Sequence, residues 1–377
     1  HLFAYSGGTD FTLHNYAPIA SVIALPLVDP LGVVGAFNAV MLASIVSSGI
    51  GLFILARRLG LGEGAAWSSG AIFMAAPALI ARETAHFSLV ITAALPLFLW
   101  ALIRTLDATR TKDAVLVGVF VAAAYYSDAY YGIYCAIMGT FVVMWRYTHI
   151  EWPQTVTPSP RLERALSLII CFFGATILWR VASHTRRLAL GPIVIGLETL
   201  YTPQLILLLA VLIRLWLAWR PALRVDLPPT RLKPLMRLGS ISMGTCLLIL
   251  LPELVGMAIR ALEGRLPGTE TFWRSSPRGI DVLSYLVPNP NHPWFGGSTR
   301  IWFMPDKPDA FPEFVASFSL VALTMIGLAG RARLLPRFWL AVTAHFFLLS
   351  LGPFVHIAGV NSYVIGPWAF LRYVPVV

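Results

Sequence analysis

The chain has 377 residues, of which 57% are hydrophobic and only 12% are charged, with a formal net charge of +10. This composition is far more apolar than that of an average soluble domain, which excludes a soluble globular protein and indicates a polytopic membrane protein. The positive charge does not predict a nucleic-acid partner, because the basic residues lie in short segments between apolar runs. The three cysteines show neither a metal-binding spacing nor a disulfide framework.

Residues 1–37 are predicted to form an extracytoplasmic loop with short interfacial helices. Residues 1–16 are polar and aromatic, and Gly7-Gly8-Thr9-Asp10 is typical of a turn. Residues 17–26 are apolar but too short to cross about 30 Å of hydrocarbon, so we expect an interfacial or re-entrant segment. The chain starts at His1 without a signal-peptide pattern, and we expect it to be a piece of a longer protein at both ends.

Residues 38–259 are predicted to form the main helical bundle. Pro252 beside Glu253 indicates a broken helix near the end of this region. Two polar and aromatic turns, residues 82–86 and 127–131, separate apolar runs at one end of the bundle. The predicted spans are residues 38–56, 65–81, 87–102, 114–126, 133–145, 165–179, 201–219 and 238–259.

The rest of the chain is predicted to be a long extracytoplasmic loop (260–312), two further spans (within 313–351) and an extracytoplasmic tail (352–377). The whole chain, 1–377, is then a single transmembrane domain. The predicted fold class is all-α, a polytopic transmembrane helical bundle of about ten spans with extracytoplasmic loops.

Most Lys and Arg residues gather at one end of these predicted spans, which the positive-inside rule assigns to the cytoplasm. We therefore expect a multi-pass protein of a bacterial cytoplasmic membrane, with the turns 82–86 and 127–131 and the loop 260–312 outside. Ionisable side chains then crowd the outer face, whereas the span interiors are almost free of charge except for Arg214 and Glu253. This distribution favours an enzyme working at the outer interface over a transporter.

Short polar or glycine-containing motifs follow one another in a fixed order between the apolar runs, along nearly the whole chain. They are Gly49-x-Gly51 with Arg57-Arg58-Leu59-Gly60, Ala81-Arg82 with His86-Phe87-Ser88-Leu89, Tyr130-Tyr131-Gly132, Leu200-Tyr201-Thr202-Pro203, Leu283-Ser284-Tyr285-Leu286 with His292-Pro293, and Leu351-Gly352-Pro353. In this order they resemble the motifs of bacterial membrane glycosyltransferases of the GT-C type.

This resemblance to mannosyl- and arabinosyltransferases implies transfer of a sugar from a polyprenyl-phosphate donor to a glycan or protein acceptor outside the cytoplasm. Membrane lipid is an implied partner, and nucleic acid is not. The resemblance also implies a catalytic carboxylate in the first extracytoplasmic loop. Asp10 is the candidate within the chain, although we expect the base itself to precede His1. A divalent cation is the candidate cofactor, and no metal ligands are predicted.

Arg82 and His86 are the predicted contacts of the donor phosphate, because a phosphate leaving group needs cationic donors and arginine supplies a bidentate fork. The alternative for Arg82 is interfacial anchoring or pairing with Glu83 or Asp128. Carboxylates can accept hydrogen bonds from sugar hydroxyls and aromatic rings can stack on sugar faces. The predicted substrate-binding residues are Glu83, Asp128, Tyr130, Tyr131, Tyr285 and His292.

Two other functions stay open. In a transporter or flippase for a lipid-linked glycan, Glu253 and Arg214 would matter more than the loop residues. In a non-catalytic relative, the upstream loop would lack its carboxylate.

Overall fold

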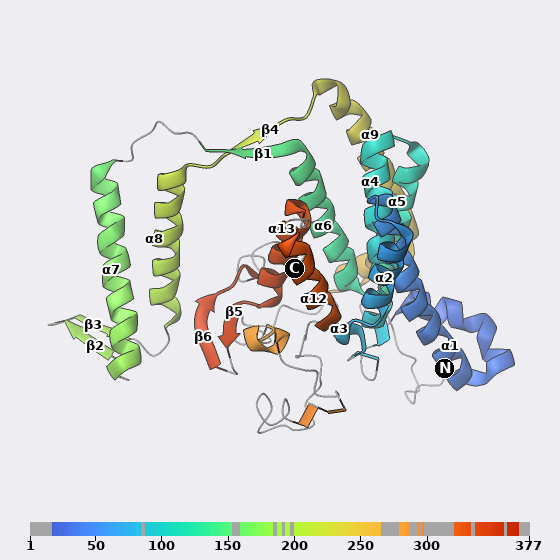
Figure 1. Ribbon diagram of the computed structural model, residues 1–377, viewed down its shortest axis with the longest axis horizontal. Coiled ribbons are helices and arrows are strands. Elements are labelled where there is room, and N and C mark those ends of the chain that lie inside the picture. The colour runs from blue at the N-terminus through green and yellow to red at the C-terminus, as the bar shows by residue number, and fades with distance from the viewer. Residues whose placement is uncertain are drawn as a thin grey trace. The chain divides into compact units, whose positions relative to one another are not determined.

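The computed structural model describes thirteen segments of the chain and contains mostly helices (Figure 1). The described residues are 17–80, 82–83, 87–152, 159–183, 187–190, 193–196, 200–264, 279–286, 293–294, 296–297, 320–332, 336–357 and 360–368. Asp10, His86 and His292 lie outside them. The chain divides into two compact units: unit 1 is His1–Met144, Leu227–Glu270 and Asp309–Leu335, and unit 2 is the remainder.

Unit 1 begins with α1, Pro18–Arg58, a 41-residue helix with one non-helical residue, Gly32 (φ 69°, ψ 170°). Two helical segments therefore meet at a kink. This conformation is accessible almost only to glycine, since a side chain at positive φ clashes with the backbone. The predicted interfacial segment 17–26 falls before the kink and the predicted span 38–56 falls after it.

The predicted spans 65–81 and 87–102 are not continuous helices, and proline explains both interruptions. In the first run α2, Glu63–Met74, stops before Pro77, which begins the short helix α3, Pro77–Ile80. In the second run the 3₁₀ turn η1, Phe87–Val90, precedes α4, Ala94–Ala108. Proline lacks an N–H and is tolerated only in the first turn of a helix, so Pro96 requires α4 to begin nearby.

The other unit 1 helices are α5 (Thr111–Ser127), α6 (Ala129–Tyr147, which continues into unit 2), α9 (Pro229–Ile249), α10 (Leu251–Leu262) and α12 (Leu320–Arg331). Helices α5 and α9 run in the same direction. The Ser242 hydroxyl, in the second half of α9, donates to the Ala114 carbonyl near the start of α5 at 2.8 Å, and the Tyr126 hydroxyl donates to the Ile249 carbonyl at 3.0 Å near the ends of both helices. Between α9 and α10 the chain bends by 69°. The broken helix predicted from Pro252 is thus confirmed.

Glycines set the contact between α1 and α2. A Cβ atom on Gly70 would lie 2.5 Å from the Gly49 carbonyl oxygen, and one on Gly49 would lie 3.0 Å from the Gly70 carbonyl oxygen. Small residues permit such close approach of helix backbones. Ser48 and Thr92 join α1 to the segment before α4 through a hydroxyl–hydroxyl hydrogen bond of 2.9 Å.

Unit 2 contains the helices α7, Pro160–Ser183, α8, Tyr201–Trp219, and α13, Arg337–Ser350, with the short turn η3, Val282–Tyr285. It also contains three antiparallel strand pairs that the all-α prediction did not include. They are β1 (Thr148–Glu151) with β4 (Ala222–Val225), β2 (Arg187–Leu190) with β3 (Ile193–Gly196), and β5 (Phe354–Ile357) with β6 (Val360–Ile365).

Three helices of the described part are long and apolar enough to cross a membrane: Pro18–Arg58, Pro160–Arg180 and Thr202–Trp219. The bent pair α9–α10 is a fourth if its two helices form one span. The described part of the chain is therefore predominantly helical and contains three or four candidate membrane spans. Several other runs predicted to cross are shorter helices, such as the 15 residues of α4 and the 14 residues of α13.

We expect Gly70→Ala to destabilise the protein by about 1–3 kcal/mol, because its added methyl group would overlap the Gly49 carbonyl oxygen and push α1 and α2 apart. Gly64→Ala in the same helix is the matched control, since a methyl group added there would meet no atom within 4 Å. Thermal unfolding of the detergent-solubilised protein measures the difference. Equal unfolding temperatures for the two variants would contradict the proposed close packing.

Candidate functional site

The candidate site lies where the segment after α3, the turn η1 and the corner between α5 and α6 meet in unit 1. Two hydrogen bonds join η1 to this corner. The Ser88 hydroxyl donates to Asp128 Oδ2 at 2.9 Å, and the Tyr131 hydroxyl donates to the Leu89 carbonyl. The turn η1 is therefore joined to the predicted turn 127–131, and Arg82 of the predicted turn 82–86 lies within electrostatic range of Tyr131 and Tyr134.

Asp128 forms the corner itself. Its backbone leaves the helical conformation after α5 (φ −159°, ψ 135°), and its Oδ1 atom accepts from the Tyr130 N–H at 3.0 Å. This is an N-cap of α6, for which aspartate is a favoured residue because it satisfies a free N–H of the first turn. Asp128 is only 1% exposed. Contact between its carboxylate and a sugar would require η1 to move, so its predicted substrate role remains a prediction.

Arg82 lies in the turn that follows α3 and is partly buried. Its Nη1 atom donates to the Ala78 carbonyl at 2.8 Å, which caps the end of α3. Among the described residues no carboxylate pairs with this guanidinium. Arg82 and Asp128 both lie within electrostatic range of the phenol groups of Tyr131 and Tyr134.

The exposure of the neighbouring predicted residues differs. Tyr131 is 8% exposed, whereas Tyr130 is 54% exposed and its ring is accessible to a ligand. Glu83 is partly buried in the turn beside Arg82. The structure thus brings together the predicted residues Arg82, Asp128, Tyr130 and Tyr131, with Glu83 next to Arg82 in the chain.

Two arginines at the opposite end of the same helices are paired with carboxylates. Arg58 Nη2 lies 2.5 Å from Asp107 Oδ2, joining the ends of α1 and α4. Arg104 Nη2 lies 2.9 Å from Oδ1 of the buried Asp113, joining α4 to the start of α5. Charge at that end therefore stabilises contacts between helices, whereas Arg82 is not used in this way.

Tyr285 lies in unit 2, where it packs against α13. Its hydroxyl hydrogen-bonds the Ser350 hydroxyl, and its ring centroid is 5.0 Å from that of Phe347. Burial raises the pKa of Tyr285, while the hydrogen bond to Ser350 opposes this, so the phenol stays protonated at neutral pH. The hydroxyl is a structural hydrogen-bonding group in this packing.

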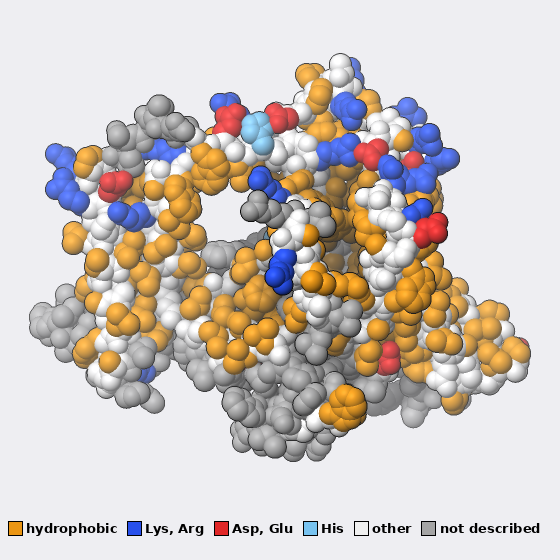
Figure 2. Space-filling view, viewed as in Figure 1, with side chains coloured by type: hydrophobic (Ala, Val, Ile, Leu, Met, Phe, Trp, Pro, Cys, Tyr) orange, Lys and Arg blue, Asp and Glu red, His pale blue; other side chains and the backbone are white. Residues whose placement is uncertain are grey.

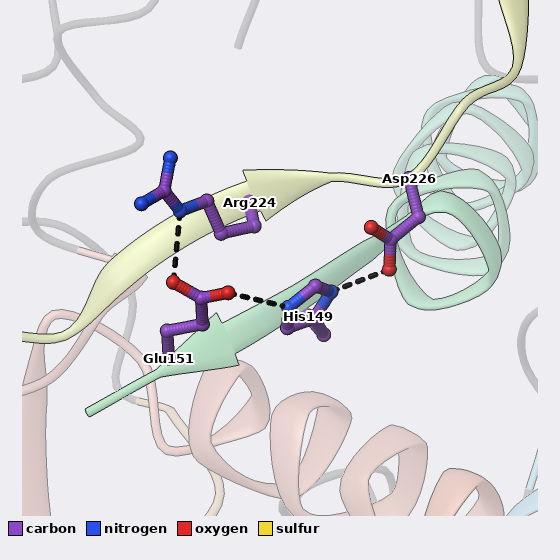
Figure 3. Close-up of polar contacts among 4 residues, drawn as sticks. All are labelled: His149, Glu151, Arg224 and Asp226. Carbon is purple, nitrogen blue, oxygen red and sulfur yellow. Dashed lines mark hydrogen bonds and ion pairs between the residues drawn. The ribbon is translucent and has the colours of Figure 1, made fainter. Parts of the chain in front are cut away.

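A second polar cluster was not predicted from the sequence (Figure 3). It consists of His149 and Glu151 on β1, Arg224 on β4, and Asp226 just after β4. His149 Nδ1 contacts Asp226 Oδ2, and His149 Nε2 lies 3.2 Å from Glu151 Oε1. Arg224 Nε donates to Glu151 Oε2 at 2.8 Å. The sequence signal for this cluster is the spacing of His149 and Glu151, which places them on one face of a strand. Their partners Asp226 and Arg224 lie more than 70 residues further along the chain, so the sequence does not indicate the pairing.

The contacts in this cluster shift the pKa values in opposite directions. The hydrogen bond to Glu151, followed by that to Asp226, raises the pKa of His149. The hydrogen bond from Arg224, followed by that with His149, lowers the pKa of Glu151. The cluster is solvent-exposed, and its two carboxylates face Arg224 and, when protonated, His149. Its contribution to the pairing of β1 with β4 therefore depends on pH.

Comparison with known proteins adds no identification: no family model matches the chain, and no curated protein or solved structure matches it. Within the described segments, no three His, Cys, Asp or Glu side chains are grouped so that they could hold a metal ion.

The β1–β4 pair is expected to be most stable between the ordinary pKa of Glu151 and the ordinary pKa of His149. Protonated His149 stabilises the pair below its ordinary pKa, and this contribution is lost as pH rises through the raised value. Ionised Glu151 contributes above its ordinary pKa, and this is lost as pH falls through the lowered value. Hydrogen exchange in residues 148–151 and 222–225, corrected for intrinsic rates, measures the loss of stability at high pH and at low pH. In His149→Gln the loss at high pH should disappear. If it persists, His149 is not the group responsible.

Proposed function

We propose that the protein is a membrane glycosyltransferase of the GT-C type, which moves a sugar from a polyprenyl-phosphate donor to an extracytoplasmic acceptor. The observation that carries this proposal is the environment of Arg82. Its guanidinium donates to a backbone carbonyl and pairs with no described carboxylate, whereas Arg58 and Arg104 at the opposite helix ends are paired. A guanidinium fork without an acidic partner suits an anionic phosphate.

In the proposed reaction the acceptor hydroxyl oxygen attacks the anomeric carbon of the donor sugar. The bond between that carbon and the phosphate oxygen breaks, and negative charge develops on the leaving phosphate. Arg82, together with His86, stabilises this charge by hydrogen bonding. The acceptor proton passes to a carboxylate of the first extracytoplasmic loop, for which Asp10 is the candidate.

The remaining residues bind or position the substrates. The exposed ring of Tyr130 offers a face for the sugar, and Glu83 offers a hydrogen-bond acceptor. Asp128 acts as a positioning residue, because its two oxygens fix η1 and the first turn of α6. The proposed location is the bacterial cytoplasmic membrane, with lipid and the polyprenyl-linked sugar as partners.

Arg82→Ala is expected to reduce sugar transfer by at least about 100-fold, because one charge-stabilising donor is typically worth that much in a transition state. Arg57→Ala is the control, since Arg57 is an exposed residue that donates to the Leu61 carbonyl and lies 3.8 Å from Glu63. The protein in proteoliposomes is given radiolabelled polyprenyl-phosphate mannose or arabinose, and transfer is measured with matched amounts of folded protein. Equal transfer by the two variants would remove Arg82 from the proposed site.

A second candidate is a transporter or flippase for a lipid-linked glycan, which the 69° break between α9 and α10 favours. Glu253 lies in the first turn of α10, directly after this break. Ionisable residues at broken helices are typical of transport sites. The other residue predicted for transport, Arg214, donates to the Glu163 carbonyl at 3.0 Å and the Ser167 hydroxyl at 2.7 Å, so it joins α7 to α8.

The transporter alternative predicts that Glu253→Gln abolishes movement of a fluorescent lipid-linked sugar between vesicle leaflets, without formation of a glycosidic bond. Arg82→Ala would then leave this movement largely unchanged. Leaflet accessibility to a membrane-impermeant quencher measures the movement. Normal movement in Glu253→Gln, combined with loss of sugar transfer in Arg82→Ala, would reject the transporter and support the transferase.

A further inference from the structure

Helices α7 and α8 form an antiparallel pair with a small interface. Leu166, Ala210 and Leu217 form its buried contact. Only 11% of each candidate span is buried, and side chains such as Leu168 and Leu178 are 71% and 72% exposed. Exposed apolar sides of this extent are suited to lipid tails rather than water.

One end of this pair carries four arginines. The start of α7 contributes Arg161 and Arg164, and the end of α8 contributes Arg214 and its C-cap Arg220. The hydrogen bonds from Arg214 on α8 to Glu163 and Ser167 on α7 show that these two ends adjoin. Figure 2 shows Lys and Arg side chains gathered at the end of α7 and α8 near β1 and β4.

These arginines are not neutralised by the neighbouring acids. Arg164 donates to the Pro160 carbonyl at 3.2 Å and Arg220 to the Leu217 carbonyl at 3.3 Å. Among the described residues, none of the four pairs with a carboxylate. Glu151 on β1 and Asp226 just after β4 are instead engaged by Arg224 and His149 (Figure 3). The only other acid at this end of the described helices is Glu163.

Exposed tryptophans surround the same end. Trp152, Trp216 and Trp219 are 55%, 58% and 57% exposed, and the rings of Trp152 and Trp219 meet edge-to-face with centroids 6.1 Å apart. Indole rings prefer the headgroup level of a bilayer, where the ring body meets lipid and the N–H meets water. The aromatic and cationic groups therefore occupy one level of the helix pair, at the end of its apolar faces.

We propose that this end of α7 and α8 is a binding surface for the phosphate headgroups of anionic phospholipids. The headgroup phosphates accept hydrogen bonds from Arg161, Arg164 and Arg220, and the acyl chains follow the apolar faces of the two helices. Charge complementarity selects an anionic over a zwitterionic headgroup. The proposal does not depend on the glycosyltransferase assignment, because none of these residues belongs to the candidate site.

The test is native mass spectrometry of the intact protein titrated with phosphatidylglycerol or with phosphatidylcholine. The triple variant Arg161→Gln, Arg164→Gln, Arg220→Gln is compared with Arg231→Gln, Lys233→Gln, Arg237→Gln, which removes the same charge from exposed positions of α9. We expect the first variant to bind at least threefold less phosphatidylglycerol than wild type and the control to bind as wild type. Phosphatidylcholine binding should not change in either.

Three results would overturn the proposal: unchanged phosphatidylglycerol binding in the first variant, equal loss in both triple variants, or equal loss of both lipids. The second result would mean diffuse attraction to net positive charge, and the third would mean apolar contacts alone. Thermal unfolding checks that each variant folds. If the first triple variant does not fold, Arg220→Gln alone is compared with Arg231→Gln, and the same three results decide.

Discussion

The arrangement of the candidate site depends on a buried carboxylate that has to be satisfied by hydrogen bonds. Asp128 is 1% exposed, and an ionised group in such a position is costly unless donors surround it. The Ser88 hydroxyl and the Tyr130 N–H supply those donors. Because Ser88 belongs to η1 and Tyr130 to α6, satisfying Asp128 fixes two segments that are about 40 residues apart in the chain. Fixing the start of α6 in this way also keeps Tyr131 and Tyr134 within electrostatic range of Arg82.

Charge has different uses at the two ends of unit 1. At one end, Arg58 and Arg104 pair with Asp107 and Asp113, so these charges join the helix ends. At the other, Asp128 is engaged by uncharged donors, which leaves Arg82 without an acidic partner among the described residues. A site for an anion requires such an imbalance. The sequence indicated where the charges lie, but not which of them are paired.

Proline and apolar length made much of the helical organisation predictable. The rule that proline interrupts a helix predicts the break beside Pro252. The same rule applies to Pro77 and Pro96, which interrupt two of the spans predicted as continuous helices. The β1–β4 pair could not be foreseen, because its register joins residues 148–151 to residues 222–225 and no local pattern encodes that pairing. The burial of Asp128 was also unpredictable, since a turn residue between two tyrosine-rich segments is equally compatible with exposure.

The kink in α1 determines which enantiomer of an amino acid position 32 accepts. Gly32 has φ 69° and ψ 170°, yet a Cβ atom added there would meet no atom within 4 Å, so glycine is required by backbone conformation and not by crowding. These torsion angles are the mirror image of an ordinary extended conformation. A D-amino acid introduced by chemical ligation would therefore fit this corner without strain, whereas its L-enantiomer would not. Handedness, rather than side-chain size, determines what position 32 accepts.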